Sequence, residues 1–312
     1  MNDLVKARRS VNVITIGGDQ LTGKSTLCKD LVNYLTNAHA TYAATKSIKP
    51  MPVTFVSAGV VFRAEAAKRG ISVGELSKLA ITDTDIDVAI EYETCKAIMG
   101  GIHAIGTETP EHTIIVEGRN PAVMARYCRE VLDKEHITAV YLSCSPRIQA
   151  RRFVGREIER PLAFRINALL PDVPYPDLHS VGEALLRIDP QDIAHHPAAL
   201  AAVQNDPQSL AIELEKMKRA AEASAAQHHA EHSRNHHAPC LTDVVHKFTL
   251  NAARDEDDRK RYLQVYDFPV DLDYRNKQLY DVVVDTSDHR PDETLTAVLA
   301  GLPNYFTKFN YE

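Results

Sequence analysis

A glycine-rich turn between an apolar run and a helical pattern constrains the fold of this chain more than any other feature. Residues 11–26 have the sequence VNVITIGGDQLTGKST, in which a β-branched run leads into GxxxxGKS and then into the helical pattern LCKDLVNYL. A strand, a tight turn and a helix start direct successive backbone N–H groups and the positive helix end to one point. This arrangement is typical of a loop that binds a polyphosphate.

Each position of this loop predicts a contact with a nucleotide. We expect Lys24 to lie on the β and γ phosphates and the Ser25 hydroxyl to bind Mg²⁺. The residues predicted to bind the nucleotide are Gly18, Asp19, Gln20, Leu21, Thr22, Gly23, Lys24, Ser25 and Thr26. The structural alternative is a glycine-rich turn that carries a lysine by chance, and it is disfavoured because context and motif agree.

Further apolar runs indicate the fold class. Four of them predict strands, at 52–57, 113–116, 137–142 and 279–285. Helical patterns lie between them, at 58–69 with a stop at Gly70, and at 73–80, 85–99 and 291–299. Five apolar strands separated by helices indicate an α/β fold with a parallel sheet and helices on both faces.

Residues suited to phosphate chemistry follow the predicted strand ends. Lys24, Ser57 and Glu117 each come shortly after a strand, and a group of arginines follows the strand that ends at Leu142. Ligands of parallel sheets bind at the carboxyl ends of the strands. We therefore expect these side chains to meet at one edge of the sheet.

The character of the chain changes between residues 158 and 253. Pro, His and Ala become frequent there, and β-branched runs disappear. Asp189-Pro190 and Asp206-Pro207 each pair an N-capping aspartate with a proline at the first helical position, so two helices are predicted to begin there. We expect a core formed by 1–157 and 254–312, and a mainly helical insertion over 158–253.

Composition limits the classes of partner. A formal net charge of −6 gives no electrostatic basis for binding nucleic acid or an anionic membrane, so a small molecule is the expected partner. No apolar segment approaches the roughly 20 residues that span a bilayer. The five cysteines are odd in number and widely spaced, which favours reduced thiols and a cytoplasmic location. A secretory signal is not expected at the N-terminus.

Several motifs, taken in order, resemble those of a known family. They are VSAGVVFRAEAAKRGISVGELSKLA, DTDID, VEGR, RFVGRE, RDEDDRKRYLQVYDFPVDLD and YDVVVDTS. Their order and rough spacing resemble the cytidylate kinases, particularly the archaeal-type branch, over about 12–157 and 254–302. The resemblance implies the phosphate-loop fold of nucleoside monophosphate kinases, with ATP and Mg²⁺, a monophosphate-binding region near 57–100, and a lid at 158–253. Lids of this family are normally short, so the resemblance leaves the insertion unexplained.

The resemblance also implies roles for individual residues. Arg63 and Arg119 match family arginines that bind the acceptor phosphate, and Glu117 occupies a position that holds Mg²⁺ through its waters. The other residues implied to contact the acceptor are Ser57, Gly59, Asn120, Arg254, Asp258 and Arg261. For Arg63 and for the 254–261 segment, a solvated helix face is the structural alternative.

Two arginines match the start of the family's lid. Arg152 and Arg156 are four residues apart, so they share one helix face, and the resemblance directs them to the ATP phosphates. Arg147 and Arg151 lie on another face and are expected to be solvated.

Asn120 departs from the bacterial-type pattern, in which an aspartate helps to recognise cytosine. An amide can contact a cytosine edge, but unlike a carboxylate it can also donate to O4 of uracil. CMP is therefore the expected acceptor by resemblance, with dCMP, UMP, AMP or another small metabolite as alternatives. An ATP-binding regulatory module whose insertion recruits a partner is the alternative from another functional class. Homo-oligomerisation through the insertion is a further alternative.

A cluster of histidines with one cysteine lies within the insertion, formed by His228, His229, His232, His236, His237 and Cys240. His228, His232 and His236 repeat every four residues, a spacing that can bring imidazoles together on one helix face for a metal. A solvated, alanine-rich connector is favoured over a metal site, because no carboxylate or cysteine pattern of a known site frames the cluster.

Overall fold

The protein is described by a computed structural model. The described residues are 11–47, 50–103, 112–118, 120–131, 136–157, 160–188, 241–265 and 275–303. The chain forms two compact units, of which the first comprises Met1–Cys144 with Glu256–Glu312 and the second Ser145–Asp255. Helix α7 (Pro146–Glu157) thus belongs to the second unit, whereas the sequence-based boundary of the insertion lies at residue 158.

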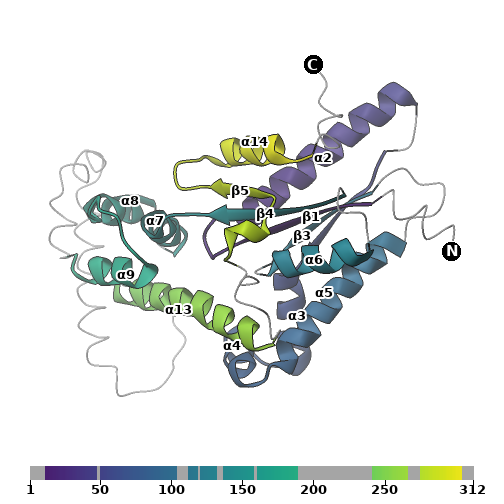
Figure 1. Ribbon diagram of the computed structural model, residues 1–312. Coiled ribbons are helices and arrows are strands. Elements are labelled where there is room, and N and C mark those ends of the chain that lie inside the picture. Colours follow the sequence, from purple (N-terminus) through teal and green to yellow (C-terminus); the bar gives the residue numbers. More distant parts are fainter. Residues whose placement is uncertain are drawn as a thin grey trace. The chain divides into compact units, whose positions relative to one another are not determined.

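The first unit is built on a five-stranded parallel sheet with the order β2-β3-β1-β4-β5, which confirms the predicted α/β fold (Figure 1). Strand β1 is central, so the turn that follows it lies between the ends of its neighbours β3 and β4. The strands are β1 (Val11–Gly18), β2 (Val53–Ser57), β3 (His112–Glu117), β4 (Ile137–Ser143) and β5 (Val282–Asp285).

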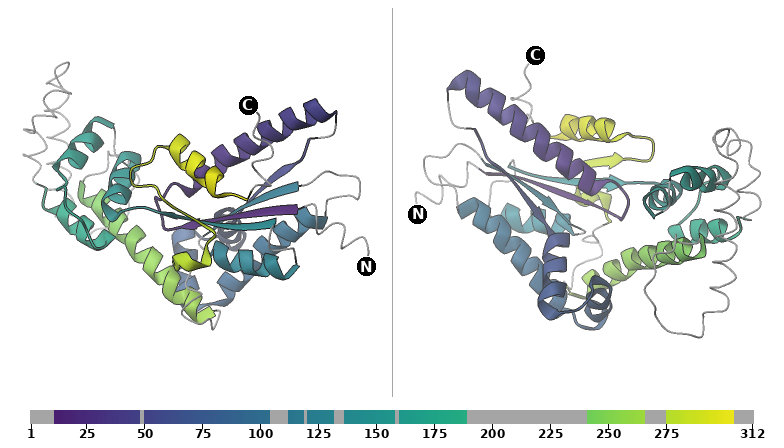
Figure 2. Two further views of the ribbon diagram at one scale, coloured as in Figure 1. Left: turned by 45° about the horizontal axis from the view of Figure 1, so that its top comes forward. Right: turned by 180° about the vertical axis from the view of Figure 1, so that it is seen from behind.

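Helices cover both faces of this sheet. Side chains of β1 alternate between two apolar clusters, with Val13 in one and Ile14 in the other. Helices α2 (Lys24–Lys46) and α14 (Pro291–Gly301) pack on the Ile14 face, and α5 (Asp85–His103) and α6 (Pro121–Val131) pack on the opposite face (Figure 2). The central strands β1, β3 and β4 are largely buried on both faces and carry continuous apolar runs, the pattern from which they were predicted, whereas the edge strands β2 and β5 are partly exposed.

The smaller helices of the first unit follow β2. Helix α3 (Ala58–Arg69) ends at Gly70, as predicted, because Gly70 adopts a left-handed conformation with φ of 68°. Helix α4 (Val73–Thr82) begins with a capping box formed by Ser72 and Glu75. These helices and α5 share an apolar cluster that includes Leu76 and Ile86.

Two element boundaries differ from the sequence-based ones. Helix α5 continues to His103, so the pair Gly100 and Gly101 does not end it. Nothing within 4 Å surrounds the Cβ position of Gly100, and the helix simply tolerates this residue. The predicted strand at 279–285 begins only at Val282, since Leu279 ends the short 3₁₀ helix η3 (Lys277–Leu279).

The second unit is helical. It contains α7, α8 (Arg160–Leu169), α9 (Leu178–Leu186) and the first part of α13 (Leu241–Val265), which continues into the first unit. Phe153 of α7 and Phe248 of α13 are fully buried, with ring centroids 5.4 Å apart. The helices predicted to start near Asp189 and Asp206 lie outside the described residues.

Candidate active site

The turn after β1 has the backbone conformation of a phosphate-binding loop. Gly18 and Gly23 have φ angles of 139° and 94°, and Leu21 between them has a φ of 63°. A Cβ atom at Gly18 would lie 2.3 Å from the backbone oxygen of Leu142, so only glycine fits beside β4. Helix α2 then begins at Lys24, which gives the turn the positive end of a long helix.

The ammonium group of Lys24 lies against the loop itself. Its Nζ donates hydrogen bonds to the backbone oxygens of Gly18 and Asp19, at 2.6 and 2.5 Å. The Lys24 amine is therefore held within the turn by Gly18 and Asp19, two of the residues that the motif predicts to surround a phosphate. A lysine in this position supplies a point charge to an anion bound by the loop.

Ser25 and Glu117 approach each other at the carboxyl ends of β1 and β3. The Ser25 hydroxyl donates to Oε1 of Glu117 at 2.6 Å, although the two residues are 92 positions apart in the chain. Ser57 at the end of β2 donates to the other carboxylate oxygen, at 3.4 Å. Thr26, the last residue of the predicted loop, is exposed on α2.

The oxygens of Ser25 and Glu117 fit a magnesium ion. Mg²⁺ prefers hard oxygen ligands and keeps several of its waters, so one hydroxyl and one carboxylate suffice. The negative charge of Glu117 is also felt by Cys28, whose pKa is raised by burial first and by Glu117 second. Among the described residues, no group of three or more His, Cys, Asp or Glu side chains is arranged to hold a metal.

The loop is supported by residues from the C-terminal part of the chain. Thr22 is buried, and its hydroxyl donates to the backbone oxygen of Asp19 at 2.9 Å. Thr286, which directly follows β5, donates to the backbone oxygen of Thr22 at 2.9 Å. Arg275 forms ion pairs with Asp19 at 3.1 Å and with Glu256 of α13 at 3.2 Å.

Sequence reasoning missed Thr286 and Arg275. Thr286 stands at a strand end, which is the one signal that could have identified it. Arg275 has no such signal, because its partners are distant in the chain.

Several residues predicted to bind the acceptor gather near the ends of β2 and β3. Arg63 is exposed on α3, and its guanidinium lies 3.6 Å from the Cβ position of Gly59. The Cβ position of Gly118 is 3.5 Å from the Cβ atom of Ala58, so β3 and the start of α3 approach closely. Arg119, the second predicted phosphate contact, lies outside the described residues.

Asn120 has a partner that the sequence did not predict. Its side-chain nitrogen donates to Oε1 of Glu91 on α5 at 2.9 Å, and Asn120 is buried while Glu91 is partly buried. Burial raises the pKa of Glu91 to about 8; the hydrogen bond from Asn120 opposes this shift, and the charge of Asp87 adds to it. At neutral pH this carboxyl group is therefore mostly protonated.

Arg261 lies in a buried ion network. Its Nη2 donates to Asp258 at 2.7 Å, and its Nε donates to Asp87 of α5. The side chain of Arg261 is 6% exposed and those of the two aspartates are each 3% exposed. Burial raises the pKa of Asp87, while the charge of Arg261 and its hydrogen bond oppose that shift. The network joins α13 to α5.

The remaining predicted arginines lie in the second unit. Arg152 is half-buried on α7, and Arg156 is exposed, with its guanidinium 5.1 Å from the ring of Phe153 and hydrogen bonded to Glu157. Arg254 is half-buried on α13.

The expectation that Arg147 and Arg151 are solvated is wrong. Arg147 pairs with Asp172, and Arg151 donates to the backbone oxygen of Asn167 on α8 at 3.3 Å. These bonds hold α7 to the segment that follows it.

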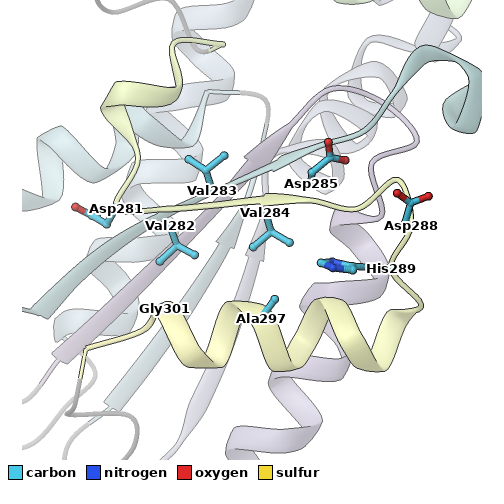
Figure 3. A pocket seen from close by; sticks show the side chains of 9 residues that line it. All are labelled: Asp281, Val282, Val283, Val284, Asp285, Asp288, His289, Ala297 and Gly301. Carbon is cyan, nitrogen blue, oxygen red and sulfur yellow. The ribbon is translucent and has the colours of Figure 1, made fainter. Parts of the chain in front are cut away.

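A groove of about 620 Å³ lies elsewhere on the first unit, between β5 and α14 (Figure 3). Val282 and Val284 point toward Ala297 and Gly301 of α14, whereas Val283 points to the opposite side of the strand (Figure 3). Its lining contains none of the residues predicted to bind a nucleotide. The histidines and Cys240 of the 228–240 cluster lie outside the described residues.

Two known proteins resemble part of this chain. No protein-family model matches the chain. The chain is similar to a cytidylate kinase from Pyrobaculum neutrophilum, with 26% identity over 145 residues, which cover 46% of this chain and 60% of that protein. It is also similar to a cytidylate kinase from Pyrobaculum arsenaticum, with 24% identity and the same coverage. In the part of the chain that the structure describes, no helix has the length and apolarity to cross a membrane.

The matched relatives are distant, and the chain spans 60% of their length. The first unit, with its five-stranded parallel sheet and glycine-rich loop, has an α/β fold consistent with that of phosphate-loop nucleoside monophosphate kinases.

Proposed function

We propose that this chain is an ATP-dependent nucleoside monophosphate kinase and that its acceptor is CMP or dCMP. The reaction would be in-line transfer of the γ-phosphoryl group of ATP to an oxygen of the acceptor phosphate. The names of the two relatives support this choice of acceptor, since both are called cytidylate kinases.

One observation carries the proposal. The Ser25 hydroxyl and the Glu117 carboxylate meet at 2.6 Å, directly beside the loop that holds Lys24. Phosphoryl transfer needs Mg²⁺ oriented against the phosphates, and a hydroxyl and a carboxylate beside the loop offer the oxygen ligands that this ion prefers. Ser25 and Glu117 would hold that ion, and Mg²⁺ supplies charge neutralisation on the transferring group.

The other residues then have defined tasks. Lys24 would leave the backbone oxygens of Gly18 and Asp19 and pair with the β and γ phosphates. Arg63, Arg119 and Arg261 would hold the acceptor phosphate in line with the attack. The acceptor oxygen is already anionic, so no general base is required, and catalysis depends on positioning and electrostatics.

Three residues of the second unit complete the proposal. Arg152 and Arg156 would contact the ATP phosphates, and Arg254 would join Asp258 at the acceptor sugar. Closure over the nucleotides would exclude water and suppress plain hydrolysis of ATP. The 158–253 segment is also our candidate for contacts between copies or with a protein partner.

A coupled assay with CMP, dCMP, UMP and AMP tests the proposal. We expect CMP or dCMP to give the highest turnover. Arg63→Ala should lower turnover about 100-fold or more while ATP still binds, because a charge is lost at the acceptor phosphate. Arg69→Ala is the matched control, since Arg69 is on the same helix and pairs with Glu65.

Two outcomes would refute the proposal. ATP hydrolysis at the same rate with and without every acceptor would favour a regulatory ATP-binding module. Equal losses in Arg63→Ala and Arg69→Ala would remove Arg63 from the acceptor site.

A further inference from the structure

Two carboxyl groups, of which Asp87 is buried and Glu91 partly buried, lie one helical turn apart on α5 and contact residues proposed to bind the acceptor. Asp87 contacts Arg261, and Glu91 contacts Asn120. Residues four apart share one face of a helix, so this single face of α5 holds both partners. The acidic residues near the start of α5 would by sequence alone be assigned to stabilising the helix dipole.

At a pH above about 8, where Glu91 is ionised and can only accept hydrogen bonds, its contact determines which way the Asn120 amide points. The amide nitrogen donates to Oε1 of Glu91 at 2.9 Å, so the amide oxygen is directed elsewhere. An amide offers a donor and an acceptor on different sides, and fixing one fixes the other. The oxygen is then the acceptor that Asn120 can present to a ligand.

The orientation has a chemical consequence at the acceptor base. An amide oxygen accepts a hydrogen bond from the exocyclic amino group of cytosine but not from O4 of uracil, which is itself an acceptor. An amide turned by half a rotation would present its nitrogen and would favour uracil instead. The ionised carboxylate of Glu91 thus gives an asparagine the hydrogen-bonding character of an aspartate.

The contact of Asp87 acts on a different part of the ligand. Arg261 is held by Asp87 and Asp258 from two helices, through its Nε and Nη2 atoms. A guanidinium has a planar, fixed set of donors, so binding two of them fixes the direction of the rest. The direction of the remaining Arg261 donors affects how a phosphate is held and has no effect on which base is bound.

We propose that Asp87 and Glu91 are positioning residues for the acceptor nucleotide: Glu91 orients the Asn120 amide toward a base that bears an amino group, and Asp87 orients Arg261 toward the acceptor phosphate. The inference rests on the proposed function and deepens it. It separates the selection of the base from the binding of the phosphate, and assigns the two tasks to neighbouring turns of α5.

Calorimetric titration of the full chain with CMP and with UMP tests this assignment at about pH 8.5, above the pKa of Glu91, where the carboxylate can only accept hydrogen bonds. We expect Glu91→Gln to lower the preference for CMP over UMP about tenfold, because a glutamine can donate as well as accept and so permits both amide orientations. Glu93→Gln is the matched control, since Glu93 is exposed on the same helix and pairs with Lys96. It should leave the preference unchanged.

Asp87→Asn should weaken CMP and UMP equally, by about tenfold each, and should leave their ratio unchanged. If α5 had only a structural role, both variants would bind CMP and UMP more weakly. The effect on base preference would then not differ between Glu91→Gln and Asp87→Asn. Circular dichroism spectra of the variants would establish that each is folded before titration.

The outcomes separate this inference from the function on which it rests. If the wild-type chain binds and phosphorylates CMP but Glu91→Gln keeps the same preference for CMP over UMP, the orienting role of Glu91 is refuted while the kinase proposal stands. An altered base preference in Asp87→Asn would refute the division of tasks. If the wild-type chain neither binds nor phosphorylates any monophosphate, both the function and the inference are refuted.

Discussion

The hydroxyl of Thr286 donates to the backbone oxygen of Thr22 at 2.9 Å, across 264 positions of sequence. The same hydroxyl lies 3.0 Å from the backbone oxygen of Ser143 at the end of β4. One buried side chain therefore links the ends of β4 and β5 to the phosphate-binding loop. Removing the hydroxyl is costly because the buried Thr22 carbonyl loses this donor, whereas the Ser143 carbonyl still accepts from the backbone N–H of Thr286 at 2.9 Å.

We expect Thr286→Val to destabilise the protein by about 1–2 kcal/mol and to weaken ATP binding. Valine has the same shape but lacks the hydroxyl, so the change tests the hydrogen bond and leaves the packing in place. Urea denaturation measures the first effect and calorimetry the second. Thr296→Val on the exposed face of α14 is the control and should change stability by less than about 0.5 kcal/mol. Equal stability of the two variants would contradict the role of Thr286.

Gly18→Ala should destabilise the fold by about 2 kcal/mol or more. A methyl group there would lie 2.3 Å from the backbone oxygen of Leu142, and the φ of 139° is unfavourable for alanine. Gly100→Ala is the opposite case, because its Cβ position is open and it lies within α5. That change should stabilise the protein by about 0.5–1 kcal/mol. Thermal unfolding of both variants checks the pair, and a stable Gly18→Ala protein would argue against this loop geometry.

Ser25→Ala should raise the Mg²⁺ concentration required for half-maximal nucleotide binding about tenfold or more, because one oxygen ligand is lost. Glu117→Gln should act in the same direction. Titration of Mg²⁺ at fixed ATP, followed by calorimetry, measures the shift without relying on turnover. Thr45→Val, near the far end of the same helix, should leave the Mg²⁺ requirement unchanged. An unchanged requirement in Ser25→Ala would exclude this hydroxyl as a ligand.

The stability of the protein should fall as the pH rises from about 4.5 to about 8, through the contribution of Glu91. Burial raises the pKa of this carboxyl group from 4.5 to about 8, so the folded protein retains a proton that the unfolded chain releases in this range. Its contribution is fully present below the unfolded pKa and is lost as the pH passes the folded pKa. The slope is at most about 1.4 kcal/mol per pH unit for one proton.

Urea denaturation at a series of pH values tests this expectation. Asp87 acts in the same direction as Glu91, because burial raises its pKa too. Glu91→Gln should flatten the dependence of the unfolding free energy on pH, and Glu93→Gln should not. A Glu91→Gln protein with the wild-type slope would show that this carboxyl group is ionised in the folded state.

The sequence alone predicted those helices, strands and turns whose conformation is determined by residues adjacent in the chain. The parallel sheet follows from β-branched runs that are buried on both faces, and Gly70 ends α3 because glycine accepts a left-handed conformation. The turn after β1 was predictable for the same reason, since Gly18, Gly23 and Lys24 lie close together in the chain. Where local preference was weak, as at Gly100 in α5 and Leu279 before β5, the predicted boundaries were wrong.

The partners of the site residues arise only from packing. Glu91 meets Asn120 across 29 positions, Asp87 meets Arg261 across 174, and Thr286 meets Thr22 across 264. The sequence around a charged or polar residue does not reveal whether its side chain faces water or a buried partner. That difference arises only when the chain folds and excludes water from around the side chain. The sequence thus predicted which types of residue form the site, whereas the hydrogen bonds and ion pairs that orient these residues could be found only from the tertiary structure.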